Sequence, residues 1–168
     1  VLANSIIADD FKRNGDEKSF RRMLARENIV SEQEMLLSYP VRILARKNIE
    51  EALLITKLLK DYDPRLVVSL SHSDDYRNRL QEFARRHFIE FSFGEVSSFL
   101  GFDDPKKYRV ADFMASSDAV LTTSVREGFG MVFIEPWLSE SPVIGRDIPS
   151  VTNDFSRNGI DLDHVYDS

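Results

Sequence analysis

Short runs that favour β-strands alternate along this chain with longer segments of helical pattern. The strand-like runs are Met35–Tyr39, Leu66–Leu70, Ile89–Phe93, Ala119–Thr123 and Val143–Gly145. The helical segments are Asp16–Asn28, Ile49–Lys60, Asp74–His87, Lys107–Ser116 and Met131–Leu138. Strands separated by helices imply βαβ crossovers, because parallel neighbours need a long connection between them. We therefore predict an α/β protein whose parallel sheet carries helices on both faces.

Composition narrows the classes of protein that this pattern allows. The 168 residues have room for one domain, and a net charge of −6 argues against a nucleic-acid partner, which would need a basic face. The chain has no cysteine, and its three histidines are scattered, so we predict neither disulfides nor a metal site. No apolar run approaches the about 18 residues of a transmembrane segment. We expect a single cytoplasmic domain over residues 1–168, and its start at Val1 suggests a piece of a longer protein.

The segment Arg126–Glu135 combines two carboxylates with a tight glycine turn. Glu127 and Glu135 lie eight positions apart, and Gly128-Phe129-Gly130 separates a predicted strand from a predicted helix. A strand, a glycine turn and a helix start form an anion site, because free N–H groups and the helix dipole point at the ligand. The carboxylates on each side can accept hydrogen bonds from hydroxyls. Phosphate between hydroxyls describes a nucleotide-sugar, although two solvated glutamates around an ordinary turn would look the same.

A second candidate site follows the first predicted strand. Arg42, Arg46 and Lys47 fall within six positions, with no acidic residue among them. Cations near the start of a helix are disfavoured by its dipole, so this arrangement asks for a compensating anion. A diphosphate would serve, because arginine offers a bidentate fork and lysine a mobile point charge. The alternative is a solvated basic loop.

The glutamate segment resembles the donor-site signature of retaining glycosyltransferases of the GT-B type, in the large family 4 (glycosyl transferases group 1). The resemblance is carried by Glu127-Gly128-Phe129-Gly130, by Glu135, and by the sequel Pro142-Val143-Ile144. It spans residues 4–154 and is most specific around residues 42–48 and 124–135. It implies a Rossmann-like, doubly wound parallel sheet, the C-terminal half of a GT-B fold.

The resemblance also implies roles for individual residues. Glu127 would face the transferred sugar as the catalytic residue, and Glu135 would hold the ribose hydroxyls. Arg42 and Lys47 would clamp the diphosphate, and Arg46 could replace Lys47 if the loop is turned. The substrate-binding residues carried over in this way are Arg42, Lys47, Val96, Ser124, Gly128, Phe129, Gly130, Met131, Val132 and Glu135.

Two of these assignments rest on short matches. Phe93-Gly94-Glu95-Val96 resembles the family turn whose backbone reads the nucleobase, which would place Val96 beside the base. Ser124 stands where the family has a Pro-Ser or similar pair. Its hydroxyl could bond the ligand or only satisfy the turn.

The chain departs from the family pattern at three places. Pro40-Val41 stands where a glycine often precedes the arginine, which puts backbone contacts to the ligand there in doubt. Pro136 lacks the N–H for a helical bond, so the helix should be kinked or restarted there. The usual glycine before Pro142 is missing, which removes the expected C-cap.

Farther upstream, Asn48 followed by Glu51 predicts a capping box at the start of the helix at Ile49.

The activity that the resemblance implies is transfer of a hexose from a nucleoside diphosphate sugar to an acceptor hydroxyl, with retention and without a metal or other cofactor. The acceptor would bind an N-terminal domain that this chain lacks, and that domain could hold the enzyme peripherally at a membrane. The chain alone would then be inactive as a hexosyltransferase. Two alternatives stay open: a phosphorylase or epimerase on the same scaffold, and a non-catalytic nucleotide-sugar binding module.

Overall fold

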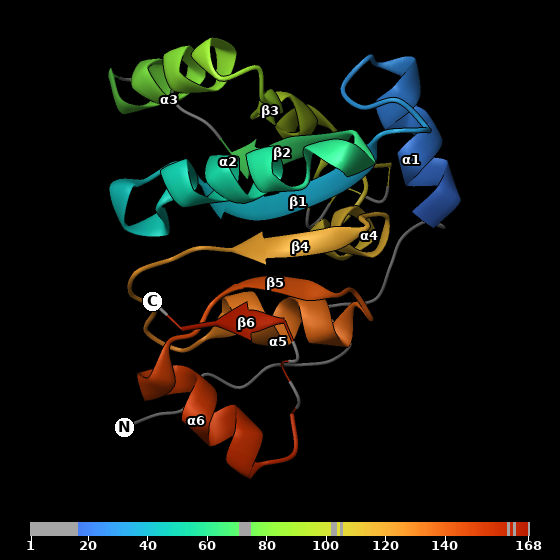
Figure 1. Cartoon of the computed structure of the whole chain (residues 1–168). Helices are drawn as coiled ribbons and strands as arrows, with labels where there is room; N and C mark the ends of the chain where they lie inside the picture. Colours follow the sequence, from blue (N-terminus) through green and yellow to red (C-terminus); the bar gives the residue numbers. More distant parts are fainter. Residues whose placement is uncertain are drawn as a thin grey trace.

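A six-stranded sheet, in which each strand is parallel to its neighbours, forms the centre of the protein (Figure 1). The computed structural model describes residues 17–70, 75–101, 104, 106–160, 162 and 164–167. The strands are β1 (Met35–Arg42), β2 (Pro64–Leu70), β3 (Glu90–Phe93), β4 (Ala119–Thr122), β5 (Val143–Arg146) and β6 (Val165–Tyr166). Their order, β3-β2-β1-β4-β5-β6, is that of a doubly wound Rossmann-like sheet. The predicted fold class is thereby confirmed.

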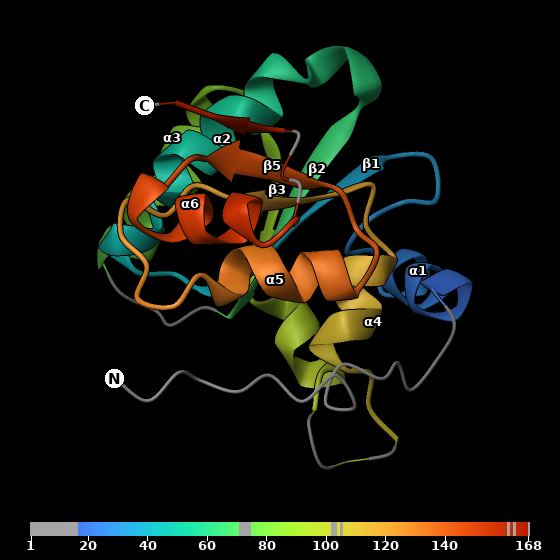
Figure 2. The ribbon, with the colours of Figure 1, turned by 90° about the horizontal axis from the view of Figure 1, so that it is seen from below.

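Helices cover both faces of this sheet (Figure 2). The helices are α1 (Glu17–Arg26), α2 (Ile49–Leu58), α3 (Asp75–Arg86), α4 (Val110–Ala115), α5 (Met131–Leu138) and α6 (Pro149–Arg157). Short 3₁₀ turns are η2 (Ala45–Lys47), η3 (Lys60–Tyr62) and η4 (Glu95–Phe99). In Figure 2, α2 and α3 lie on one side of the sheet, and α1, α4 and α5 lie on the other.

Alternate side chains of the inner strands enter two different apolar clusters. Leu37 and Tyr39 of β1 join Val68 in the cluster beneath α2 and α3. Leu36 and Val67 point the other way, into the cluster with α1, η4 and α4. Side chains of a strand alternate between the two faces, and a sheet that is covered on both faces buries both sets. A third cluster joins α5 and α6 to β5.

The first strand continues beyond its predicted end. We predicted an end at Tyr39, just before Pro40, but β1 runs on to Arg42. The register with β2 shifts between Tyr39 and Arg42, where three steps along β1 match two along β2. This bulge accommodates the proline and carries the strand to the site.

Most other differences from prediction are at element ends. The predicted helix 49–60 divides into α2 and η3, and α4 is shorter than the predicted 107–116. The short elements α6 and β6 were not predicted. A two-residue strand carries too little pattern to detect, whereas Pro149 at the start of the amphipathic α6 is a helix-start signal that we did not use. Asp16 and Asp74, the first residues of two predicted helices, lie outside the described residues.

Helix α2 begins at the predicted residue, but Asn48 does not cap it. Asn48 has φ of 50° and makes no side-chain cap bond. Asn48 forms the left-handed turn that joins η2 to α2, so its backbone is not in the extended conformation that an N-cap residue adopts. Its side-chain amide donates instead to the carboxylate of Glu51, which also accepts from Arg146 and Tyr166.

Helix α5 accommodates two of the departures from the family pattern, Pro136 and the missing glycine before Pro142. It is one helix from Met131 to Leu138 with Pro136 inside it, so the predicted restart is absent. Glu140 takes the left-handed conformation, with φ of 56°. The N–H of Ser141 then donates to the carbonyl of Pro136 at 3.0 Å, as in a glycine-ended helix. Glu140 stands at the position of the family's glycine and adopts its conformation.

Candidate functional site

The candidate site lies where the order of the strands reverses. Strands β1 and β4 are neighbours, with Leu37 opposite Ala119, yet they are far apart in sequence. Their carboxyl ends point to the same side, on the left in Figure 1. The loops of residues 43–48 and 123–130 therefore leave the sheet side by side. Ligands of doubly wound sheets bind at this switch point.

Backbone and hydroxyl contacts join these two loops. The N–H of Val125 donates to the carbonyl of Arg46 at 3.1 Å. The hydroxyl of Thr123 lies 3.1 Å from the carbonyl of Lys47 and 2.9 Å from that of Asn48. Because a loop carbonyl at a helix start needs a partner, these bonds fix the backbone that carries Lys47.

The phenol of Tyr39 lies at the centre of the same network. Its hydroxyl donates to the carbonyl of Lys47 at 2.8 Å and accepts from the N–H of Thr123 at 3.1 Å. Burial raises the pKa of this phenol, so it stays protonated as a donor. The buried Ser124 places its Oγ 3.3 Å from the Tyr39 hydroxyl. Ser124 was expected either to bond the ligand or to satisfy the turn, and this contact with Tyr39 belongs to the second role.

Glu127 pairs with the cations of the loop after β1. The Nζ of Lys47 donates to its Oε1, and the two side chains are only 8% and 10% exposed. Nη1 of Arg46 lies 3.9 Å from the other carboxylate oxygen, although Arg46 is 53% exposed. The pairing joins the two predicted loops and leaves Lys47 as their most buried cation.

Arg42 lies apart from this pair. It ends β1 just after the bulge, on the carboxyl edge of the sheet, and its side chain is exposed. Among the ion pairs of the described residues, none involves Arg42. Its guanidinium is thus available to an anion arriving at this edge.

The glycine loop borders a hollow of about 430 Å³, lined by Arg46, Arg126, Glu127, Gly128, Phe129, Gly130 and Met131. Gly130 has φ of 71°, and a Cβ there would meet Val151 of α6 at 2.2 Å. A Cβ on Gly128 would meet no atom within 4 Å. Gly130 is therefore required by the fold, whereas Gly128 leaves open space in the hollow.

Glu135 borders a neighbouring pocket of about 420 Å³ at the ends of β1 and β2. Pro40, Leu70, Ser97, Leu100, Arg109 and Val110 are among its other lining residues. Burial raises the pKa of Glu135, and the charge of Lys47 opposes this in part. Val132 and Glu135 also line a narrow crevice beside Tyr39. The pocket is mostly apolar with one carboxylate, as a nucleoside site would be.

The side chain of Val96 does not line this pocket. It is fully buried in the cluster with α1 and α4, within η4. Its neighbour Ser97 lines the pocket instead. Any contact of Val96 with a ligand would thus be through its backbone, as the resemblance implied.

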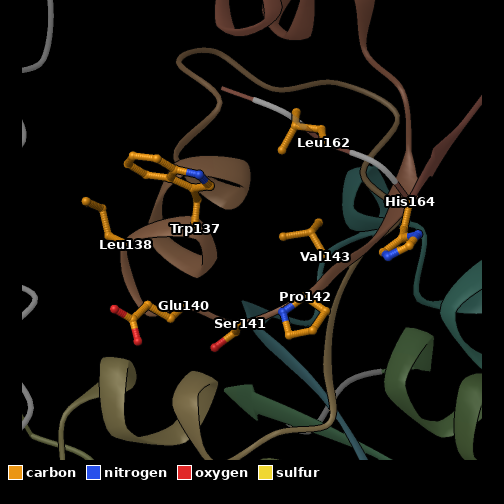
Figure 3. Close-up of a pocket in the computed structure, with 8 residues that line it drawn as sticks. All are labelled: Trp137, Leu138, Glu140, Ser141, Pro142, Val143, Leu162 and His164. Carbon is orange, nitrogen blue, oxygen red and sulfur yellow. The ribbon is translucent and has the colours of Figure 1, made fainter. Parts of the chain in front are cut away.

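A hollow larger than these two lies elsewhere, near the amino ends of β5 and β6 (Figure 3). Its volume is about 620 Å³, and Trp137, Pro142, Val143, Leu162 and His164 are among its lining residues. These residues lie at the end of α5 and the start of β5 and β6. It is remote from the switch point, so size alone does not identify the functional site. Across the parts of the chain that the structure describes, no acidic and histidine side chains cluster as metal ligands would.

Sequence reasoning missed Tyr39, Thr123 and Arg109 as parts of the site. Tyr39 and Thr123 were expected only as strand residues, and Arg109 only as part of a helix. A polar hydroxyl at the carboxyl end of an apolar strand is a usable signal for the first two. Their partners lie 84 positions apart, so the pattern alone could not pair them.

Fold and site together define a Rossmann-like domain with a polar site at its switch point. The sequence pattern of the glycosyl transferases group 1 matches residues 20–159. The chain belongs to this family. Within the described part of the chain, no helix has the length and apolar character needed to cross a membrane.

Two curated relatives come from Petrotoga mobilis. Mannosylglucosylglycerate synthase is 24% identical over an alignment 154 residues long that covers 79% of this chain and 36% of that protein. Mannosylglucosyl-3-phosphoglycerate synthase is 30% identical over 119 residues, 71% of this chain and 22% of the relative. The chain thus spans about a third or less of the curated relatives that it matches.

Solved structures share the fold. Anabaena HepE, in complex with UDP-glucose, superposes with a TM-score of 0.63 at 20% identity, covering 86% of this chain and 37% of HepE. The C-terminal domain of a glycosyl transferase group 1 protein (LpcC) from Francisella tularensis gives a TM-score of 0.56 at 21% identity. That match covers 79% of this chain and 70% of the domain.

Proposed function

We propose that this chain is the donor-binding, C-terminal domain of a two-domain GT-B glycosyltransferase. The observation that carries the proposal is the pairing of Lys47 with Glu127 at the switch point, beside the pocket that contains Glu135. Family membership and the likeness to a solved C-terminal domain support it. The acceptor would bind a further domain, so the chain alone binds donor without turnover.

Each part of a nucleoside diphosphate sugar has a matching part of the site. The nucleoside occupies the pocket of about 420 Å³, with its ribose hydroxyls donating to Glu135. The diphosphate lies between Lys47, Arg42 and the first N–H groups of α5. The hexose extends over Gly128 toward Glu127, where the loop leaves open space. Ser124 and Tyr39 support this arrangement from below.

The reaction that we propose is transfer of the hexose with retention and without a metal. The bond between the anomeric carbon and the diphosphate oxygen breaks, and the acceptor oxygen bonds to that carbon on the same face while its proton passes to the departing diphosphate oxygen. Negative charge grows on the departing diphosphate, where Lys47, Arg42 and the start of α5 stabilise it. Glu127 orients the sugar through its hydroxyls, which is most effective in the transition state.

Calorimetric titration with uridine, UDP and UDP-glucose, and with the guanosine series, tests the proposal. We expect the wild type to bind one diphosphate sugar, and Lys47→Ala to weaken the diphosphates about ten- to a hundredfold, the contribution of one charge-assisted contact. The nucleoside should bind either protein equally. Equal losses for nucleoside and diphosphate would remove Lys47 from the phosphate site, and no binding in either series would refute the function.

A further inference from the structure

The buried ammonium of Lys47 already has an anionic partner within the protein. Its Nζ donates to Glu127, and both side chains are at least nine-tenths buried. Arg46 is a weaker partner, because its guanidinium is 3.9 Å from the carboxylate and half exposed, so solvent screens it. Glu127 is therefore already paired with the ammonium group that a phosphate of the ligand would need.

We propose that Glu127 competes with phosphate for Lys47 and thereby makes the site prefer a nucleoside diphosphate sugar over the bare nucleoside diphosphate. This inference rests on the proposed function. A phosphate oxygen that takes the ammonium deprives Glu127 of its nearest hydrogen-bond donor. A carboxylate left partly buried without a partner is costly, and the phosphate adds like-charge repulsion.

The hexose of the donor removes this penalty. Its hydroxyls donate to Glu127 and replace the bond that Lys47 gives up. A bare diphosphate ends at its terminal phosphate and offers Glu127 no such donor. The diphosphate sugar thus binds more tightly than the bare diphosphate, because its hydroxyls supply the hydrogen bonds that Glu127 otherwise receives from Lys47.

The structure allows this exchange without a large rearrangement. The backbone of Lys47 is fixed by Tyr39 and Thr123, whereas its flexible side chain has three donors that can turn between acceptors. Glu127 lies on the loop that borders the open space over Gly128. After transfer the product lacks the hexose, so Glu127 regains Lys47 and favours release of the diphosphate.

The test measures UDP and UDP-glucose, and GDP and GDP-mannose, by calorimetry on the 168-residue chain and its Glu127→Gln variant. Glutamine keeps the size of the side chain and removes the charge. We expect the variant to bind the bare diphosphate about tenfold more tightly, the low end for a charge-assisted bond. It should bind the sugar nucleotide more weakly. The preference of the wild type for the sugar nucleotide over the bare diphosphate should therefore become smaller or reverse.

Glu34→Gln is a matched control at the other edge of the sheet. Glu34 is also 10% exposed in an ion pair, with Arg65 at 2.6 Å, and its loss changes the net charge equally. Both affinities should stay as in the wild type. A gain for UDP in this control would trace the effect to overall charge and overturn the proposal.

A double-mutant cycle isolates the competition. In a Lys47→Met background, Glu127→Gln should no longer strengthen UDP binding, because there is no ammonium to release. If Glu127→Gln does not fold, Glu127→Asp withdraws the carboxylate by one methylene and should shift UDP affinity in the same direction by a smaller factor. Unchanged or weaker UDP binding by Glu127→Gln and Glu127→Asp in the presence of Lys47, with UDP-glucose bound by the wild type, overturns the competition alone. Absence of binding by the wild type overturns the proposed function as well.

Discussion

At the residue scale, the site holds three ionisable side chains in buried or half-buried surroundings. Lys47 and Glu127 are buried as a pair, and Glu135 has a raised pKa beside the pocket that we propose for the nucleoside. A raised pKa such as that of Glu135 is common at functional sites, where burial and neighbouring charges serve a ligand. Substitutions there should separate stability from binding.

Glu135→Gln should stabilise the fold at neutral pH while weakening ribonucleotides. Burial raises the pKa of the folded carboxyl above its ordinary 4.5, so the folded state holds the proton to higher pH than the unfolded chain. The contribution of Glu135 to stability is therefore present below pH 4.5 and lost as pH rises through the folded pKa.

Urea unfolding of both proteins between pH 4 and 7 measures this difference. The advantage of the glutamine variant should shrink toward the acid end. Titration with 2′-deoxy and 3′-deoxy nucleotides gives the second reading: the wild type should prefer the ribo-ligand, and the variant should lose that preference. Equal binding of deoxy and ribo ligands by the wild type would exclude a ribose contact.

Tyr39→Phe should weaken diphosphate binding without affecting the bare nucleoside. The substitution removes the hydroxyl that holds the carbonyl of Lys47 and receives the N–H of Thr123. Leaving these groups unpaired should lower the free energy of unfolding by about 1–3 kcal/mol. A few-fold loss of diphosphate affinity should accompany it as the loop of Lys47 loosens.

Tyr108→Phe is the control for this prediction. Its hydroxyl bonds Ser19 at 2.9 Å, away from the site, so the variant should lose stability without any change in ligand affinity. Parallel losses of nucleoside and diphosphate in Tyr39→Phe would reduce Tyr39 to a purely structural residue.

At the element scale, the turn between β4 and α5 has one glycine for the fold and one for the open space of the site. Gly130→Ala should destabilise the protein by at least about 1 kcal/mol, because φ of 71° strains alanine and its Cβ would collide with Val151 and Phe155. Gly128→Ala should change stability by less than about 0.5 kcal/mol, yet weaken a diphosphate sugar.

Urea denaturation and calorimetry on the two alanine variants compare these positions directly. Gly128→Ala meets no protein atom, so a loss of affinity at unchanged stability would locate the ligand over Gly128. Unchanged affinity for the sugar nucleotide would place the hexose elsewhere.

At the scale of the whole molecule, the proposed reaction needs an acceptor domain in addition to this one. The chain spans 36% and 22% of its two curated relatives. We expect a protein that also contains the acceptor domain to transfer the hexose with the donor's anomeric configuration, as read by NMR of the product, and to keep its rate in EDTA. An inverted product would refute retention, and inactivation by EDTA that added metal reverses would refute metal independence.

The local pattern was sufficient for the order of the helices and strands from α1 to β5. Alternating apolar runs predicted five of the strands and the parallel sheet, because a strand needs buried side chains and a helix needs an apolar stripe wherever they lie. Glycine and carboxylate spacing likewise predicted the loop at the end of β4. The cap at Asn48 and the end of β1 were wrong, because tertiary contacts override local preference at element ends.

By itself the sequence determined the helices and strands from α1 to β5, because these depend on neighbours along the chain. It also indicated the candidate residues Arg42, Lys47, Glu127 and Glu135. Only the tertiary structure decided which of them meet. Lys47 and Glu127 are 80 positions apart and become partners because β1 and β4 are adjacent in the sheet. Tyr39 joins the same site through partners 84 and 85 positions away. Hydrogen bonds and ion pairs depend on distance in space, and the packing of the whole sheet sets that distance.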